Sequence, residues 1–553
     1  MKISISRLKQ LVPNSLSTEQ VADALTMAGL EVEEVSPVAP AFSGIKIAEV
    51  VSVDAHPDAA KLKVCQVNAG EGAPLQIVCG APNVATGMKV PFAVVGAKLP
   101  GLDIKAAKLR GVESFGMLCS ARELGLSDDH GGLLALPADA PIGVDFRAWL
   151  DLDDDILTLK ITPNRGDCLS MIGIARDFAA VTGLPLIPGK IEDVALTGND
   201  LRAISIQAPE ACGQYFGRAI TGLNPQAQSP AWLTRRIERA GLRPISPLVD
   251  ITNLVMIELG QPMHAFDQEK LKGNISVRFA RAGESLRLLT GVDAKLDESM
   301  LLICDASGPV AIGGVMGGES TMCTDTTTSV FFESAWFAPD VIRGKAKALG
   351  INSDAAYRFE RGVDPSSATS ALEWATSMTR EICGTEATHI GPVCSALGQL
   401  PLRNPVTVRP HRAERLIGMP IATEMQIDAL KRVGCKVDKA GESLNATAPS
   451  HRFDLTIEED FVEEIARIHG YARIPDRAPV STLPMLQIPS NQGSKPALKI
   501  ALARMGYHEA INYSFVDPDW ETDFCGHANP PRLQNPIASH MAAMRSSLIG
   551  GMV

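Results

Sequence analysis

Carboxylates are concentrated between residues 451 and 475, in the segment HRFDLTIEEDFVEEIARIHGYARIP. Six acidic residues fall within eleven positions, namely Asp454, Glu458, Glu459, Asp460, Glu463 and Glu464. Carboxylate oxygens of this kind suit a hard cation such as Mg²⁺ when several of them share one surface. The pattern raises two hypotheses, which are a cation site and an acidic helix face exposed to water.

Apolar spacing in the same segment predicts a helix that begins near Ile457. At about 100° per residue, one packing stripe would hold Ile457, Phe461, Ile465 and Ile468. Thr456 and Glu459 fit a capping box at the start of this helix.

The remaining acidic residues of the segment gather beside this stripe. Asp460, Glu463 and Glu464 share an arc at spacings of three and four residues, and Asp454 can fold back over it. Glu463 and Glu464 can equally pair with Arg467 on a solvated surface. Spacing alone therefore leaves the metal hypothesis open.

A second group of polar residues lies within apolar sequence. In PLVDITNLVMIELGQPMHAFD (247–267), Asn253 and His264 interrupt an apolar run, although a lone histidine is more often structural. The glycines of AIGGVMGG (311–318) would allow close backbone approach to a ligand. No G-x-G-x-x-G motif opens a helix here, so a dinucleotide site is not indicated.

Basic residues gather in one region of an acidic chain. The net charge of −11 argues against a generic basic protein that coats nucleic acid. Residues 39–125 hold nine Lys and Arg against seven Asp and Glu, a local charge of +2, within short β-rich runs that predict a small barrel. A phosphate-tracking surface there would use Lys61, Lys63, Lys98, Lys105, Lys108 and Arg110. Ordinary solvated lysines on a barrel rim are the alternative.

Cysteine usage and hydropathy indicate the cellular compartment. Eleven cysteines are scattered without a Cys-x-x-Cys pair, which argues against a zinc ribbon and a disulfide framework and favours the reducing cytoplasm. The first residues, MKISISRLKQLVPNSLS, lack the features of a secretory signal. No run of about 18 apolar residues predicts a membrane span. We therefore expect a cytoplasmic protein with no membrane partner.

The length of 553 residues predicts about three to five domains. Mixed helix-like and strand-like segments predict a multidomain α+β protein in which a barrel is inserted into an N-terminal α/β module. A proline-rich linker is expected at 474–489, and the last segment reads as the start of a domain that is cut short. The expected domains are 1–38 with 150–195, 39–149, 196–398, 400–476 and 490–553.

Three phrases in the barrel region carry a resemblance. PDAAKLKVCQVNAG, IVCGAPNV and GLDIKAAKLRGVESFGMLCSARELGL follow one another in this order. They resemble the tRNA-binding module with an oligonucleotide-binding (OB) fold found in tRNA-associated proteins. The resemblance covers 39–149 and implies contact with tRNA, without showing which lysines make it.

Four phrases carry a second resemblance, namely the segments at 247–267 and 311–318, FFESAWF and NSDAAYRFERGVDP. They are similar to the editing (B3/B4) domain of the bacterial phenylalanyl-tRNA synthetase β subunit, which hydrolyses tyrosine wrongly attached to phenylalanine tRNA. The resemblance implies that Glu333 receives the tyrosine hydroxyl and that His264 positions or polarises water near the ester. With them, the pocket would contain Asn253, Thr252, Gly314, Gly317 and Ala355.

The acidic segment also matches a family pattern. R-x-D-x5-D-x2-EE is read here without departure from Arg452 to Glu464. In phenylalanyl-tRNA synthetase β chains this pattern carries Mg²⁺ in the B5 domain, at a site shared with the α subunit. The resemblance implies Mg²⁺ ligands at Asp454, Asp460, Glu463 and Glu464, and a site that is incomplete without α.

This resemblance covers essentially the whole chain, and residues 490–553 resemble the start of the family's inactive, class II synthetase-like domain. It implies a β subunit of an (αβ)₂ heterotetramer that joins phenylalanine to tRNA(Phe) using ATP. Activation would reside on α, and editing and tRNA contact on this chain. The alternatives are a non-catalytic tRNA-binding scaffold with an inactive editing pocket and a free-standing deacylase.

Overall fold

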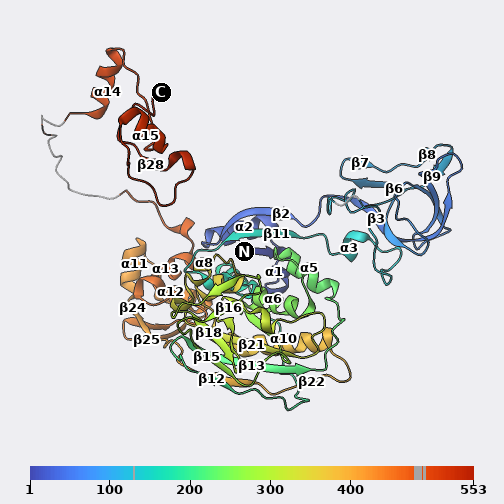
Figure 1. Cartoon of the computed structure of the whole chain (residues 1–553), viewed down its shortest axis with the longest axis horizontal. Coiled ribbons are helices and arrows are strands. Elements are labelled where there is room, and N and C mark those ends of the chain that lie inside the picture. The colour runs from blue at the N-terminus through green and yellow to red at the C-terminus, as the bar shows by residue number, and fades with distance from the viewer. Residues whose placement is uncertain (129–130, 479–488, 490–492) are drawn as a thin grey trace. The chain divides into compact units, whose positions relative to one another are not determined.

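A computed structural model describes residues 1–128, 131–478, 489 and 493–553 (Figure 1). The chain forms two compact units, Met1–Pro475 and Asp476–Val553. Most of the linker predicted at 474–489 lies outside the described residues. Within the described part of the chain, no helix is long and apolar enough to cross a membrane. All eleven cysteines are free thiols.

The N-terminal module is a small antiparallel sheet covered by helices. Its strand order is β1-β11-β2, so β11, which follows the barrel in sequence, lies between the two strands that precede it. Its strands are β1 (Lys2–Ser4), β2 (Glu31–Pro37) and β11 (Asp155–Lys160). Its helices are α1 (Ile5–Leu11), α2 (Thr18–Met27) and α4 (Met171–Thr182), with a 3-10 turn, η1 (Gly166–Cys168). Ser17 and Gln20 form the capping box that starts α2.

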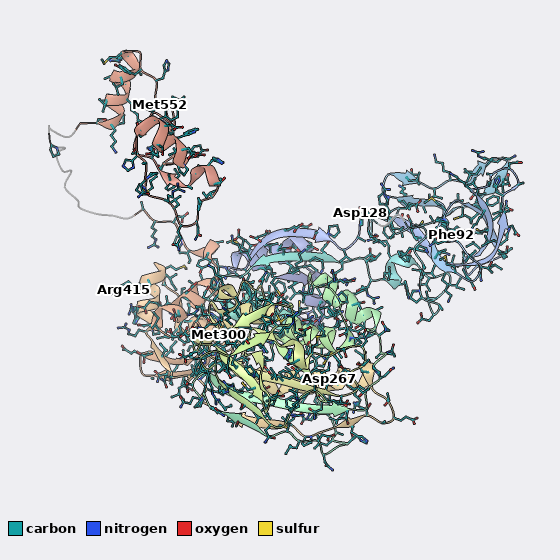
Figure 2. All side chains as sticks on the ribbon, viewed as in Figure 1. Phe92, Asp128, Asp267, Met300, Arg415 and Met552 are labelled. Atoms are coloured by element: carbon teal, nitrogen blue, oxygen red, sulfur yellow. The ribbon has the colours of Figure 1, made fainter. Side chains whose placement is uncertain are left out.

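Between β2 and β11 the chain forms an antiparallel sheet of the order β10-β6-β3-β4-β5, with β7 paired to β6. Its strands are β3 (Ser43–Ala55), β4 (Lys63–Asn68), β5 (Leu75–Cys79), β6 (Lys89–Leu99), β7 (Leu102–Asp103) and β10 (Met117–Leu118). A hairpin, β8 (Ala107–Leu109) with β9 (Val112–Ser114), and helix α3 (Phe146–Trp149) accompany it. The end strands β10 and β5 contact each other, so the sheet curls toward a barrel, and Phe92 is fully buried in it (Figure 2).

The central domain stacks two sheets. The first has the order β14-β21-β13-β22, with β23 also paired to β13, and the second has the order β12-β15-β18-β19-β20. The first contains β13 (Cys212–Thr221), β14 (Met263–Asp267), β21 (Val330–Phe337), β22 (His389–Ile390) and β23 (Cys394–Leu397). The second contains β12 (Ile204–Ile206), β15 (Ile275–Phe279), β18 (Leu301–Asp305), β19 (Gly308–Ile312) and β20 (Met316–Gly317). One hydrophobic core lies between the two sheets.

Helices cover the other face of the first sheet and form a second core with it. These are α5 (Ala231–Arg239), α6 (Pro247–Leu259) and α10 (Ala368–Cys383). Shorter elements complete the domain, namely β16 (Ser285–Arg287), β17 (Asp293–Lys295), η2 (Glu319–Thr321), α7 (Pro339–Ile342), α8 (Lys345–Ala348), α9 (Asp354–Phe359) and η3 (Pro365–Ser367). The first sheet is thus buried on both faces.

A small α+β unit follows, with a sheet of order β24-β26-β25. Its elements are β24 (Val406–Val408), α11 (Pro410–Ile417), α12 (Thr423–Arg432), β25 (Lys436–Ala440), β26 (Ser443–Thr447), α13 (Glu458–His469) and η4 (Tyr471–Arg473). Ala180 and Val181 of α4 belong to its hydrophobic core, so this unit packs directly on the N-terminal module.

The second compact unit contains short elements. They are α14 (Lys495–Arg504), β27 (Phe515–Val516), α15 (Pro518–Cys525), η5 (Ser539–Met541) and β28 (Ala543–Met544), with β27 and β28 paired.

Candidate functional site

Strand register brings two of the predicted pocket residues together. His264 on β14 lies directly opposite Glu333 on β21, and Gly217 on β13 lies opposite Glu333 on its other side. Directly opposed residues of antiparallel strands project from the same face. That face is the one that packs toward the second sheet, because Phe331 and Phe266, which are likewise opposed, belong to the core between the sheets.

Glu333 is a carboxyl group in apolar surroundings. Its side chain is 7% exposed, and its Oε2 accepts a hydrogen bond of 2.8 Å from the hydroxyl of Tyr215. Burial raises the pKa of Glu333 to about 7, and the hydrogen bond from Tyr215 opposes this rise. The group therefore titrates near neutral pH, at which its ionised form can accept a further hydrogen bond.

His264 is held by apolar contacts. Its ring stacks edge-on against Phe266 with centroids 4.4 Å apart. Burial lowers the pKa of His264 to about 4, so the imidazole is neutral at pH 7. Its Nε2 is buried and, among the described residues, has no hydrogen-bond partner. A buried polar atom of this kind is costly unless a ligand or water meets it.

The predicted glycine turn closes over His264. A Cβ added to Gly317 would lie 2.4 Å from His264 Cε1 and 2.6 Å from Nε2, so only glycine lets the turn approach the ring. Gly314 has a φ of +68°, and a Cβ added to it would lie 3.1 Å from the rings of both Phe337 and Phe359.

Helix α9 begins beside the same turn. Ser353, its N-cap, donates a hydrogen bond of 2.8 Å to the carbonyl oxygen of Val315. Ala355, in the first turn of α9, packs against the core between the two sheets. The glycine turn and the start of α9 are therefore tied together on the side of His264 and Glu333.

Thr252 and Asn253 come from another element. Both lie on α6, whose apolar residues pack on the opposite face of the first sheet. The Thr252 hydroxyl donates to the carbonyl oxygen of Val249 at 2.9 Å, within its own helix. Among the described residues, no hydrogen bond joins either side chain to His264 or Glu333. Their place in the pocket stays a prediction.

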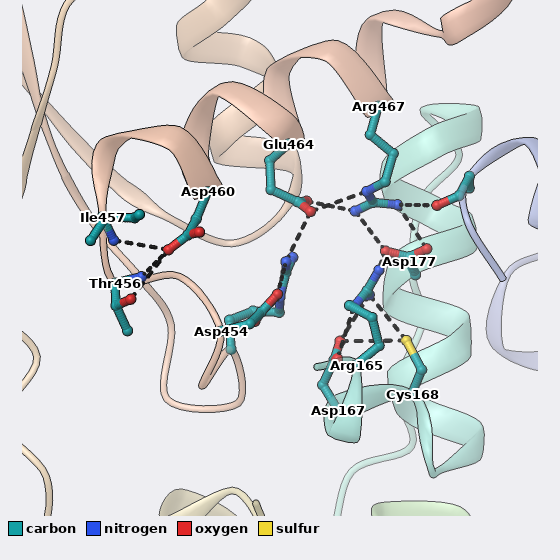
Figure 3. Close-up of polar contacts among 12 residues, drawn as sticks. Arg165, Asp167, Cys168, Asp177, Asp454, Thr456, Ile457, Asp460, Glu464 and Arg467 are labelled. Carbon is teal, nitrogen blue, oxygen red and sulfur yellow. Dashed lines mark hydrogen bonds and ion pairs between the residues drawn. The ribbon is translucent and has the colours of Figure 1, made fainter. Parts of the chain in front are cut away.

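The acidic segment forms a buried ion network (Figure 3). Arg452 holds Asp454 with two hydrogen bonds of 2.9 and 2.8 Å and also donates to Glu464 at 2.9 Å. Glu464 accepts from Arg467 at 3.1 and 2.6 Å, and Arg467 reaches Asp177 on α4 at 2.9 Å. Burial alone would raise the pKa of Glu464, but its two arginine partners hold it well below its usual range.

Asp460 caps the start of α13. Its Oδ2 accepts hydrogen bonds from the backbone N–H of Thr456 at 2.7 Å and of Ile457 at 2.9 Å. The predicted capping box of Thr456 with Glu459 is wrong, because Ile457 is the N-cap and Asp460 is the residue that reaches back. As N-cap, Ile457 is 55% exposed and leaves the packing stripe, whereas Phe461 is fully buried.

The four predicted Mg²⁺ ligands are therefore not gathered around one point. Asp454 and Glu464 are neutralised by Arg452, Asp460 caps the helix and Glu463 is exposed. Within the described ranges, no group of three or more His, Cys, Asp or Glu is placed to hold a metal ion. In this chain by itself, these residues do not fit an Mg²⁺ site.

The six predicted tRNA-binding residues differ in how far their charged groups are exposed to solvent. Lys61, Lys98, Lys105, Lys108 and Arg110 are exposed. Lys63 is half-buried, and its Nζ donates to the carbonyl oxygen of Val84 at 3.1 Å. Lys105 lines a groove of about 940 Å³ between β5, β10 and the segment that carries the β8–β9 hairpin.

Comparison with known proteins decides the family. Four family models match: "B3/4 domain" at 211–384, "Putative tRNA binding domain" at 45–145, "tRNA synthetase B5 domain" at 406–471, and "Phenylalanyl tRNA synthetase beta chain CLM domain" at 474–553. Proteins of Chromobacterium violaceum and Aromatoleum aromaticum, each named "Phenylalanine--tRNA ligase beta subunit", are 50% identical over 100% of this chain and 70% of their own length. The chain belongs to the bacterial phenylalanine–tRNA ligase β subunit family.

Members of this family are components of an aminoacyl-tRNA synthetase. Among solved structures, an N-terminal fragment of the phenylalanyl-tRNA synthetase β subunit from Pyrococcus horikoshii matches 85% of this chain and 99% of that fragment. The two chains are 13% identical, and the TM-score is 0.35.

Sequence reasoning overlooked Tyr215, which makes the only hydrogen bond to the Glu333 side chain within the described residues. Strand alternation in CGQYFGRAIT could have placed Tyr215 on the face of Gly217, but the register with β21 is not visible in the sequence. The role of Asp177 in the ion network was missed for a similar reason, because its partner Arg467 lies 290 residues away in the chain. The pairing of Arg452 with Asp454 and Glu464 is local, and it was missed although these residues are only 2 and 12 positions apart.

Proposed function

We propose that this β subunit hydrolyses tyrosine wrongly attached to tRNA(Phe), at a pocket formed by His264 and Glu333 under the glycine turn at 313–318. The observation that carries the proposal is their placement on opposed positions of β14 and β21. One group is a carboxyl that can accept a phenolic hydroxyl, and the other is a neutral imidazole with a buried, unpartnered Nε2 among the described residues.

Glu333 supplies the selectivity of the proposed reaction. An apolar pocket made for phenylalanine rejects tyrosine only weakly, because the two differ by one hydroxyl, so a second site that removes the error is useful. An ionised carboxylate forms a charge-assisted hydrogen bond with a phenol. Phenylalanine lacks the hydroxyl and cannot form this bond, so phenylalanyl-tRNA would be bound and hydrolysed less well.

His264 orients the water in the proposed reaction. Water adds to the ester carbonyl carbon, and the bond between that carbon and the terminal ribose oxygen breaks. The products are tyrosine and tRNA with a free ribose hydroxyl, which takes up a proton from the water. Neutral Nε2 of His264 accepts a hydrogen bond from this water and so aligns it with the carbonyl. Asn253 and Thr252 are assigned to the same pocket by family resemblance.

The partners of the proposed function follow from the family. An α subunit would carry amino-acid activation with ATP, and two copies of each chain would form an (αβ)₂ enzyme in the cytoplasm. The region 45–145, matched by the tRNA-binding family model, would contact tRNA(Phe). Mg²⁺ at Asp454, Asp460, Glu463 and Glu464 would require ligands from α, and no step of the hydrolysis passes through it.

Deacylation of preformed tyrosyl-tRNA(Phe) by the αβ complex tests the proposal. The parent complex should release tyrosine, and His264→Ala should slow the release about 100-fold because the water loses its orientation. Asn253→Ala should also slow it. His389→Ala, at an exposed histidine of β22, is the matched control and should behave like the parent.

Equal rates for His264→Ala, Asn253→Ala and the parent would show that the pocket is assigned wrongly. No tyrosine release by the parent would favour the alternative of a tRNA-binding scaffold with an inactive pocket. Failure to co-purify with an α chain would favour a free-standing deacylase.

A further inference from the structure

Tyr215 is a buried phenol that shares the candidate pocket with the residue expected to bind a phenol. Its side chain is 0% exposed, and its hydroxyl donates to Glu333 Oε2 at 2.8 Å. It lies on β13 two residues before Gly217, the direct partner of Glu333, and thus on the same face of the sheet as Glu333.

Packing around Gly217 explains why Tyr215 reaches the carboxylate. A Cβ added to Gly217 would lie 2.2 Å from the ring of Phe331, so that ring fills the space directly beside Glu333 on β13. Only a longer side chain from a neighbouring position of the strand can reach Glu333 from this side. Tyr215 does so diagonally, over a distance that suits an aromatic residue.

The hydrogen bond uses one of the two oxygens of Glu333. Within the described residues, no other hydrogen bond is made to this side chain, so Oε1 is left for a ligand. Without Tyr215 the carboxyl group could rotate about its terminal torsion, which is broad in glutamate. With Tyr215 in place, Oε2 is fixed and the direction in which Oε1 points is fixed with it.

We propose that Tyr215 is a positioning residue for selectivity, which holds Glu333 by Oε2 so that Oε1 meets the hydroxyl of a mischarged tyrosine. This inference rests on the proposed hydrolysis of tyrosyl-tRNA(Phe). In the bound state Glu333 bridges two phenols, one from the protein and one from the substrate. Tyr215 itself acts only through Glu333 and does not touch the reacting ester.

The decisive comparison is Tyr215→Phe in the αβ complex, which removes one hydroxyl and keeps the buried ring. Hydrolysis of tyrosyl-tRNA(Phe) and of phenylalanyl-tRNA(Phe) is measured for the parent complex and for the Tyr215→Phe complex from pH 6 to pH 9. We expect kcat/KM for the tyrosyl substrate to fall about tenfold, the cost of one misplaced hydrogen bond. Hydrolysis of the phenylalanyl substrate should change little, so the ratio of the two rates falls. Tyr507→Phe, at an exposed phenol, is the control.

The pH profile separates positioning from support of the fold. The titratable groups that face Glu333 in the described part of the chain are Tyr215 and Cys212 on β13 and His264 on β14. In the parent, the ratio of tyrosyl to phenylalanyl hydrolysis should rise as Glu333 ionises. Loss of the Tyr215 hydrogen bond should move this rise to higher pH, because that bond favours the ionised form.

A double-mutant cycle with Glu333→Gln completes the test. If Tyr215 acts through Glu333, Tyr215→Phe should change the rate ratio far less in the Glu333→Gln background than in the parent. Should Tyr215→Phe alone not fold, the double variant is compared directly with Glu333→Gln. Loss of the Tyr215 hydroxyl should then leave the rate ratio nearly unchanged, and a tenfold loss there would contradict the inference.

The inference and the proposed function fail in different ways. An unchanged ratio and pH profile in Tyr215→Phe, with a parent that hydrolyses tyrosyl-tRNA(Phe), would overturn the inference alone. An equal loss on both substrates without a pH shift would do the same, since it would assign Tyr215 to the fold. A parent that does not hydrolyse tyrosyl-tRNA(Phe) would overturn the proposed function and, with it, the inference.

Discussion

At the scale of single residues, Glu333 is stabilised in its neutral form by the fold. No ion pair to it is present in the described residues, and burial raises its pKa to about 7. A carboxyl whose folded pKa exceeds its unfolded value of about 4.5 contributes stability fully only below that value. This contribution is lost as the pH rises through 7.

Glu333→Gln is therefore predicted to stabilise the chain in a pH-dependent way. At pH 5 the variant and the parent should unfold at similar temperatures, and at pH 8 the variant should be more stable by up to about 3 kcal/mol. The amide oxygen can still accept the Tyr215 hydrogen bond. Thermal unfolding of the complex at both pH values measures this, with Glu463→Gln as an exposed control. A parent and a variant that unfold at the same temperature at pH 8 would contradict it.

The sequence predicted some residues of the candidate pocket and missed another. His264 and Glu333 were predicted by resemblance to a family motif, and the structure brings them to opposed strand positions. Tyr215 was not predicted, since it lies 118 residues from Glu333 and no local pattern joins them. Residues that meet through strand pairing are visible only once the register is known.

At the scale of elements, α13 is joined to α4 by charges. Glu464 lies between Arg452 and Arg467, and Arg467 pairs with Asp177, which Arg165 also contacts. Glu464 is 3% exposed, so its removal would leave buried arginine charges without their partner. The network therefore holds the small α+β unit against the N-terminal module.

Glu464→Gln and Glu463→Gln form a matched pair that separates this structural role from metal binding. Breaking the buried ion pairs of Glu464 should lower the free energy of unfolding by about 3–5 kcal/mol. Glu463 is exposed, so its change should alter stability by less than about 0.5 kcal/mol. Urea or thermal unfolding without Mg²⁺ tests this. If both variants unfold like the parent, the network does not support the fold, and loss of Mg²⁺-dependent α association in Glu463→Gln alone would favour the shared metal site.

The same helix shows which local features sequence can predict. The apolar period predicted α13 and its buried Phe461, Ile465 and Ile468, whose packing repeats every three to four residues. The start of the helix was placed one residue too early, because Asp460 competes with Glu459 for the capping position. Which of two adjacent acidic residues caps a helix depends on small differences in hydrogen-bond energy. The apolar period carries no information about those differences.

At the scale of the whole molecule, family resemblance predicted more than composition could. Four family models lie along the chain in the order that the motifs suggested. Composition indicated only a multidomain α+β protein with a slightly basic barrel. The buried ion network around Glu464 could not be predicted from the sequence for a physical reason, since Asp177, one of its members, comes from another domain and lies 290 residues from Arg467.

The lysines of the barrel allow a test of how this acidic chain would bind tRNA, which is itself a polyanion. Lys61 and Lys105 are exposed, whereas the Nζ of Lys63 is bonded to the Val84 carbonyl oxygen. Removing an exposed lysine that contacts a phosphate should weaken binding at low salt and lower the salt slope of the affinity by about one. Removing Lys63 should instead destabilise the barrel and leave the salt slope close to that of the parent, because its ammonium group is already hydrogen-bonded to the carbonyl oxygen of Val84.

Titration of tRNA(Phe) into the αβ complex at several salt concentrations distinguishes these cases for Lys61→Ala, Lys105→Ala and Lys63→Ala. The first two should bind more weakly by about fivefold to tenfold at low salt and approach the parent as salt rises, because screening removes the same charge interaction. Lys63→Ala should mainly lower the unfolding temperature. A chain of net charge −11 can attract tRNA only through a local excess of positive charge. If the affinity for tRNA depends on salt with the same slope in all three variants and in the parent, tRNA does not contact this face of the barrel.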